Sequence, residues 1–131
     1  MHREAGDRVR FLVVYIREAH ATDEWVSESN VEAGIGVAQP TTVADRCDVA
    51  RTMCDRLDVS MPVVTDSLDD RVATLYGAWP DRVYVIDESG VVTLKTAVGP
   101  FGFETCDVRA MLVSRWGLTL SPTTYEPPAR S

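Results

Sequence analysis

The feature that most constrains the fold is a short, unbroken apolar run near the start of the chain. Residues 11–16 read Phe-Leu-Val-Val-Tyr-Ile, and only Arg10 interrupts the wider run Val9–Ile16. β-branched and aromatic residues favour a strand, and the absence of polar alternation predicts burial on both faces, as in a parallel sheet. The run is far shorter than the ~20 residues that a membrane-spanning helix requires. It therefore predicts a buried strand.

Helix signals follow this strand. Thr42 is placed to cap a helix ending near Leu57, and the spacing of its apolar residues predicts one inward-facing stripe: Val43, Cys47, Ala50, Cys54 and Leu57. Residues 69–76 predict a short helix closed by Gly77. Thr105 is expected to cap a last helix that ends at Gly117 and turns four side chains inward: Val108, Met111, Leu112 and Trp116.

Three further segments predict strands. Residues 62–65 form a short one, and residues 82–87 and 91–97 flank the turn Glu88-Ser89-Gly90, which indicates an antiparallel hairpin. Alternation of strands and helices predicts an α/β protein whose mixed, mostly parallel sheet is flanked by helices. The length of 131 residues fits one domain, placed at residues 1–117, and the proline-containing residues 118–131 are expected to form a disordered tail.

Charge and cysteine content narrow the function classes. Asp and Glu outnumber Lys and Arg by 20 to 13, giving a net charge of −7. This balance argues against nucleic acid or an anionic membrane as partner. Three cysteines and no apolar leader favour a reducing cytoplasm over secretion. With two histidines and no tight ligand spacing, no metal site is predicted.

Chemistry-bearing residues follow the first predicted strand, where ligands gather in open α/β sheets. Glu18 and His20 are two residues apart, which puts both side chains on one face of an extended segment. A carboxylate beside an imidazole forms a general acid/base pair. On residue types alone, a solvated loop is the commoner interpretation.

The wider string is more specific. Residues 11–25, FLVVYIREAHATDEW, resemble the iodothyronine deiodinase segment F-L-[IV]-[VI]-Y-I-x-E-A-H-x-[ST]-D-x-W. Further matches to that family lie in the same order at residues 45–51, 62–66, 75–86, 99–100 and 108–112. The resemblance covers about residues 8–113.

The resemblance implies a thioredoxin-like, peroxiredoxin-related fold and reductive removal of iodine from an iodinated phenolic compound by a selenocysteine, with a thiol co-reductant and no other cofactor. It places Glu18 and His20 as the catalytic carboxylate and proton donor. It places Pro80 where such folds carry a proline, often cis, although a plain turn former fits equally. Trp25, Trp79 and Arg82 become candidates for a substrate pocket, against core packing for the tryptophans and solvation for the arginine.

The chain departs from the family in one major respect. The nucleophile of the family precedes the strand at Val9–Ile16, and residues 1–5 resemble the end of the helix that follows that nucleophile. The first strand–helix unit is thus expected to be missing, and a selenocysteine codon read as a stop would explain a restart at Met1. Without the central strand, either two edges stay unpaired or the first strand slides to pair with residues 82–87. We expect a chain that is marginally stable or oligomeric alone, for example as a homodimer.

Three substitutions bear on the substrate. The hormone-clamping histidine of the family aligns with about Pro40, its arginine near the Gly-Pro loop with Val98, and its auxiliary cysteine with Met61. Another halogenated aromatic, or a peroxide, is therefore as plausible a substrate as an iodothyronine.

Two alternative functions stay open at this point. One is a non-catalytic thioredoxin-like binding module. The other is a peroxiredoxin-like thiol peroxidase using Cys106, which lies in the first turn of the last helix, where the helix dipole favours a thiolate. Cys47 and Cys54 are expected to be buried and inert, about 10 Å apart on one helix.

Overall fold

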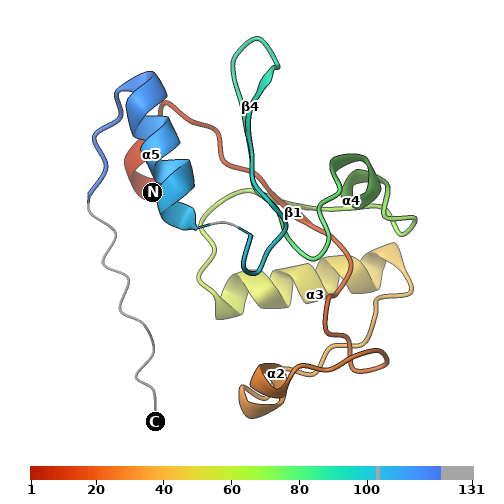
Figure 1. Cartoon of the computed structure of the whole chain (residues 1–131). Helices are drawn as coiled ribbons and strands as arrows, with labels where there is room; N and C mark the ends of the chain where they lie inside the picture. The colour runs from red at the N-terminus through yellow and green to blue at the C-terminus, as the bar shows by residue number, and fades with distance from the viewer. Residues whose placement is uncertain (103, 122–131) are drawn as a thin grey trace.

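The computed structural model describes residues 1–102 and 104–121 (Figure 1). It is a mixed α/β arrangement of small sheets flanked by helices. In chain order the elements are α1 (His2–Ala5), β1 (Val13–Tyr15), α2 (Glu28–Glu32), α3 (Val43–Arg56), β2 (Val63–Thr65), α4 (Arg71–Tyr76), β3 (Tyr84–Ile86), β4 (Val92–Lys95) and α5 (Thr105–Trp116). None of the helices in these two ranges has the length and apolarity needed to cross a membrane.

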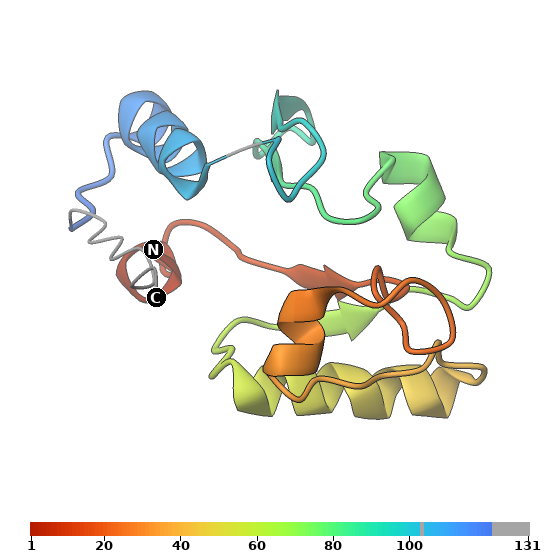
Figure 2. The same ribbon diagram turned by 60° about the horizontal axis from the view of Figure 1, so that its bottom comes forward.

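The predicted first strand is present but short. β1 pairs in parallel with β2, with Val13 opposite Val63 and Tyr15 opposite Thr65, and Tyr15 is buried. The ladder ends at Tyr15, opposite Thr65, the last residue of β2. Helix α3 covers one face of this pair (Figure 2). The parallel pairing expected from the apolar run is confirmed.

The hairpin is also confirmed. β3 and β4 pair antiparallel, with an irregularity between Val85 and Ile86. Their turn is held by Asp87, whose Oδ1 accepts the backbone N–H of Ser89 and of Val91, each at 3.0 Å. Gly90 supplies the positive φ of +84° that this tight turn requires.

The prediction of one mixed sheet is wrong in an informative way. β1 pairs only with β2, and β3 only with β4, so residues 1–102 and 104–121 contain two separate two-stranded sheets (Figure 2). Of the two expected outcomes, open edges rather than a strand slide is observed. The ladder turns the polar backbone groups of Val13 and Tyr15 toward β2, so alternation turns those of Val14 toward the open edge.

The main core lies between α1, the hairpin and α5. Its buried residues are Ala5, Val85, Val108, Leu112 and Leu118. The inward face predicted for α5 is confirmed, because Met111 and Trp116 pack against the same cluster. Leu118, the first residue of the expected tail, is only 6% exposed, because the chain folds back onto this core after Gly117. The rest of the expected tail, residues 122–131, lies outside the described residues.

The helices largely follow the expected chemistry, and three of their features need correction. The Thr42 Oγ1 accepts the N–H of Asp45 at 3.1 Å, as predicted. The cap of α5 is Glu104, one residue before Thr105, because the Asp107 carboxylate accepts the Glu104 N–H in a reciprocal capping box. Helix α2 was not predicted; it falls in a polar stretch that reads as loop.

The apolar stripe of α3 is only partly buried, which is the third correction. Ala50 is buried, but Val43 and Leu57 are 58% and 68% exposed. A helix of 14 residues overhangs a two-stranded sheet of three-residue strands at both ends. Cys47 and Cys54 are accordingly half-buried rather than fully buried.

Candidate functional site

Glu18 and His20 lie in the loop that leaves the carboxyl end of β1, where the sequence placed them. Both side chains are half-buried. Burial raises the pKa of the Glu18 carboxyl, and the nearby His20 charge partly offsets this effect. The two groups are therefore close enough to interact electrostatically. No hydrogen bond joins them within the part of the chain that the structure describes.

The His20 ring is oriented by Trp25. Their ring centroids are 4.6 Å apart and their planes meet at 64°, an edge-to-face contact. The Nδ1 atom of His20 is buried and has no hydrogen-bond partner among residues 1–102 and 104–121. Trp25 itself is 70% exposed, so it does not serve as core packing. One face of this pair is therefore open to solvent.

Arg17 connects this loop to Trp79. Its Nη2 donates to both carboxylate oxygens of Glu24, at 3.1 and 3.0 Å. The same guanidinium lies 5.7 Å from the centre of the Trp79 ring, a cation–π contact. Trp79 is 47% exposed. Arg17 thus links Trp79 to the loop that carries His20.

Pro80 and Arg82 follow Trp79. The Trp79–Pro80 peptide bond is cis, the alternative that the sequence left open. Arg82 is half-buried, and its Nη1 donates to the carbonyl of Tyr76 at 3.4 Å, at the end of α4. This contact ties Arg82 to the protein backbone. Arg82 therefore has a structural contact that neither of the two earlier interpretations, solvation and substrate binding, includes.

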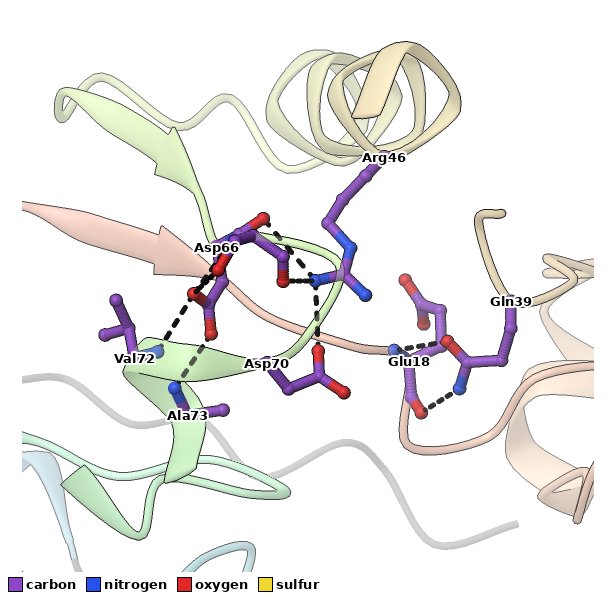
Figure 3. Close-up of polar contacts among 8 residues, drawn as sticks. Glu18, Gln39, Arg46, Asp66, Asp70, Val72 and Ala73 are labelled. Carbon is purple, nitrogen blue, oxygen red and sulfur yellow. Dashed lines mark hydrogen bonds and ion pairs between the residues drawn. The ribbon is translucent and has the colours of Figure 1, made fainter. Parts of the chain in front are cut away.

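The loop is also fastened to the segment that precedes α3. Gln39 pairs with the backbone of Glu18: its Oε1 accepts the Glu18 N–H at 3.2 Å, and its Nε2 donates to the Glu18 carbonyl at 2.7 Å (Figure 3). The Gln39 N–H in turn donates to Asp23 Oδ1 at 3.0 Å. These contacts fix the loop on both sides of His20.

A buried carboxylate fixes the neighbouring connection. Asp66 follows β2 and is 3% exposed; its carboxylate accepts the N–H groups of Ser67, Val72 and Ala73 at 2.8–3.0 Å (Figure 3). Burial opposes ionisation, but these hydrogen bonds outweigh it and lower the pKa of Asp66. Asp66 therefore anchors the start of α4, the helix that leads into Trp79.

Arg46 completes this lock from α3. Its Nη1 donates to the carbonyl of Ser67 at 2.7 Å and to Asp70 Oδ1 at 3.0 Å, and the side chain is 4% exposed (Figure 3). The family resemblance marked Arg46 by sequence but gave it no role. The structure shows that it joins α3 to the loop between β2 and α4.

The three cysteines lie on other parts of the protein. Cys106 is exposed in the first turn of α5, and its Sγ donates to the Oδ1 atom of the neighbouring Asp107 at 4.0 Å. Figures 1 and 2 place α5 next to α1, away from α2 and the His20 loop. Cys47 contacts Thr65, with Sγ 3.5 Å from the hydroxyl oxygen. The described residues contain no cluster of metal-ligand type.

Sequence reasoning found Glu18, His20, Trp25 and Trp79 but missed Arg17, Glu24 and Gln39. Arg17 and Glu24 are seven residues apart in an irregular loop, a spacing that no periodic rule connects. Gln39 and Glu18 are 21 residues apart. A polar residue directly before Pro40 was the only local signal for Gln39.

Comparison with known proteins gives a consistent result. A family model described as iodothyronine deiodinase matches residues 3–115. Type I iodothyronine deiodinase of Xenopus laevis is 32% identical over 102 residues, which are 78% of this chain and 38% of that protein. Thyroxine 5-deiodinase of Gallus gallus is 33% identical over 106 residues, 81% of this chain and 39% of that protein. The same enzyme of Bos taurus is 31% identical over 104 residues, 79% and 33% of the two chains. This chain thus spans between a third and two fifths of the length of these relatives.

Proposed function

The chain belongs to the iodothyronine deiodinase family, and on that premise we propose that it carries the acid/base half of a deiodinase-like selenol or thiol oxidoreductase. The observation that supports this most is the loop after β1. There a half-buried carboxylate, Glu18, lies close enough to His20 to interact with its charge, beside an exposed tryptophan. The two sheets and their helices are consistent with part of a thioredoxin-like fold.

The proposed reaction is reductive dehalogenation of an aromatic ring. In net form, an aryl iodide and two thiols give the dehalogenated ring, a disulfide, iodide and a proton. The carbon–iodine bond breaks, a carbon–hydrogen bond forms, and the two electrons come from the thiols. His20 supplies the proton to the ring carbon, and Glu18 stabilises the imidazolium that holds this proton. A separate thiol reductant is consumed in each turnover.

We propose an iodinated or otherwise halogenated aromatic as the substrate. Trp25, 70% exposed, packs on the His20 ring and offers an aromatic face for a substrate ring. Trp79, 47% exposed, offers a second face where it contacts Arg17 of the same loop. Pro40 and Val98 stand where hormone-clamping residues were expected by resemblance, so we do not assign an iodothyronine. The Arg17 guanidinium already pairs with the Glu24 carboxylate. This ion pair reduces the attraction of Arg17 for a carboxylate group on a substrate.

The nucleophile is proposed to lie on a segment that this sequence does not contain. Cys106 lies on α5 beside α1, and Cys54 lines a groove between α3 and β2 rather than the His20 loop. By resemblance, a selenocysteine or cysteine on a preceding strand–helix unit would supply the selenolate or thiolate. That unit would also occupy the open edge of β1.

The test is an extended protein. The coding sequence upstream of Met1 is translated through any UGA codon, and the extended chain is produced with cysteine at that position. Iodide release from an iodophenol is then measured with dithiothreitol. Release that requires the added cysteine and is absent from the 131-residue chain supports the proposal. An extended chain that binds iodophenol without releasing iodide indicates a binding module instead. Peroxide reduction abolished by Cys106→Ser would indicate the peroxidase.

A further inference from the structure

The loop that carries Glu18 and His20 contains no regular secondary structure, yet it is not free. Residues 35–40 run along it as an extended strap. The Thr22 N–H donates to the Val37 carbonyl at 2.8 Å, and the Gln39 N–H donates to Asp23 Oδ1 at 3.0 Å. The strap holds the loop at its far end, beyond His20, through backbone and carboxylate contacts.

The near end of the loop is held by one side chain. Gln39 offers the Glu18 backbone both an acceptor and a donor, at 3.2 and 2.7 Å, as a neighbouring strand would. A primary amide carries its acceptor oxygen and its donor nitrogen side by side, so it pairs with both backbone groups of one residue. The Glu18 N–H and carbonyl have no other hydrogen bond within residues 1–102 and 104–121. Figure 3 shows the Gln39 amide directed at the backbone of Glu18.

We propose that Gln39 is a positioning residue for the Glu18–His20 pair: by clamping the Glu18 backbone, it holds the carboxylate half-buried beside the imidazole. This inference rests on the proposed function, because it concerns the same acid/base pair. Gln39 does not touch the substrate and acts only through Glu18.

The clamp matters because the other anchors lie on either side of Glu18. Arg17 is held by Glu24 and Trp79, and His20 is held by Trp25. Without Gln39, the Glu18 backbone N–H and carbonyl rotate toward solvent to form hydrogen bonds with water, and the Glu18 side chain moves with them. The distance to His20 then grows, and the electrostatic interaction between the two groups falls.

The test uses the 131-residue chain, two variants of Gln39 and a matched control. Gln39→Leu removes both hydrogen bonds at nearly constant volume. Gln39→Glu, ionised at pH 7, keeps the acceptor for the Glu18 N–H but loses the donor to its carbonyl. Thr41→Val changes an exposed residue two positions after Gln39, just beyond the strap.

Four NMR readouts separate positioning from a general loss of structure. In Gln39→Leu, hydrogen exchange of the Glu18 amide accelerates about five- to tenfold, the loss expected for one hydrogen bond. In Gln39→Glu the Glu18 amide stays protected from exchange. The ¹³C chemical shift of the Glu18 backbone carbonyl changes in both variants. The raised pKa of the Glu18 carboxyl, followed by its own ¹³C signal, falls toward the ordinary value in Gln39→Leu. Resonances of Val85 and Leu112 in the core stay unchanged throughout, which rules out unfolding.

The proposal would be overturned if the Glu18 amide in Gln39→Leu exchanged at a rate within about twofold of that in the original chain. Loss of one hydrogen bond predicts a larger change. The outcome is independent of the proposed function. If Glu18 loosens as expected but the extended protein releases no iodide, the positioning role holds and the reaction is wrong. In an active extended protein, Gln39→Leu lowers kcat more than it changes KM, whereas Thr41→Val changes neither.

Discussion

Asp66 offers the sharpest stability prediction, because most of its partners are backbone groups; the Ser67 hydroxyl, 3.4 Å from Oδ1, is the exception. Its carboxylate accepts three N–H groups, from Ser67, Val72 and Ala73, in a site where Asp66 is 3% exposed. Asp66→Ala leaves these donors without an acceptor. At a net cost of about 1 kcal/mol for each, the free energy of unfolding falls by about 3 kcal/mol. That is a large share of the roughly 5–15 kcal/mol that a native domain has.

The assay is urea denaturation followed by circular dichroism, with Asp69→Ala as the control. Asp69 is exposed and lies three residues away in the same loop, so its replacement is expected to change the free energy of unfolding by less than about 0.5 kcal/mol. A difference between the two variants below about 1 kcal/mol would refute the view that this carboxylate anchors α4.

The same carboxylate predicts a pH dependence. The pKa of Asp66 is lower in the folded chain than its ordinary value of 3.8, so the folded state favours the ionised form. Its contribution to stability is therefore complete above the ordinary pKa and is lost as the pH falls below that value. Stability of the original chain should fall below about pH 4 more steeply than that of Asp66→Asn. Equal slopes would show that Asp66 ionises equally in both states.

Three further predictions concern the core, the site and the open edges. Leu112→Ala, at a position 2% exposed, should lower the free energy of unfolding by about 3 kcal/mol, against less than about 1 kcal/mol for exposed Val113→Ala; similar losses in urea denaturation would contradict the placement of the core. A double-mutant cycle of Arg17→Ala and Trp79→Ala should give a coupling energy of about 0.5–1 kcal/mol, and zero coupling would mean that the cation–π contact is not formed. The chain should self-associate at high concentration through its open strand edges, and Leu12→Lys, at a position 60% exposed beside β1, should reduce this in sedimentation experiments; a monomer at every concentration would count against it.

Much of the fold could be predicted because local signals and tertiary packing agree. The apolar run gave β1, Thr42 gave the start of α3, and Gly77 and Gly117 gave helix ends in the left-handed conformation. The separation into two sheets could not be decided, since strand pairing depends on which neighbours are present rather than on the strand itself. The exposed ends of the apolar stripe on α3 have the same cause, because the two-stranded sheet beneath the helix is too narrow to cover them.

The candidate site shows the same division. Glu18 and His20 were predictable because they lie in one short string after one strand. Their supports were not, because Gln39 and Arg17 act through loop contacts that no periodicity encodes. Arg46 was visible in the sequence as part of a motif, but its carbonyl partners after β2 became evident only in three dimensions.

The most direct test of the account is the dependence of iodide release on His20 in the extended, cysteine-containing protein. His20→Asn keeps a polar side chain but removes the proton donor. General-acid catalysis contributes about 10²–10⁴-fold, so we predict a loss of kcat of about a hundredfold or more, with KM nearly unchanged. Iodide release by His20→Asn within about threefold of the unmodified enzyme, far below that contribution, would contradict an acid/base role for this loop.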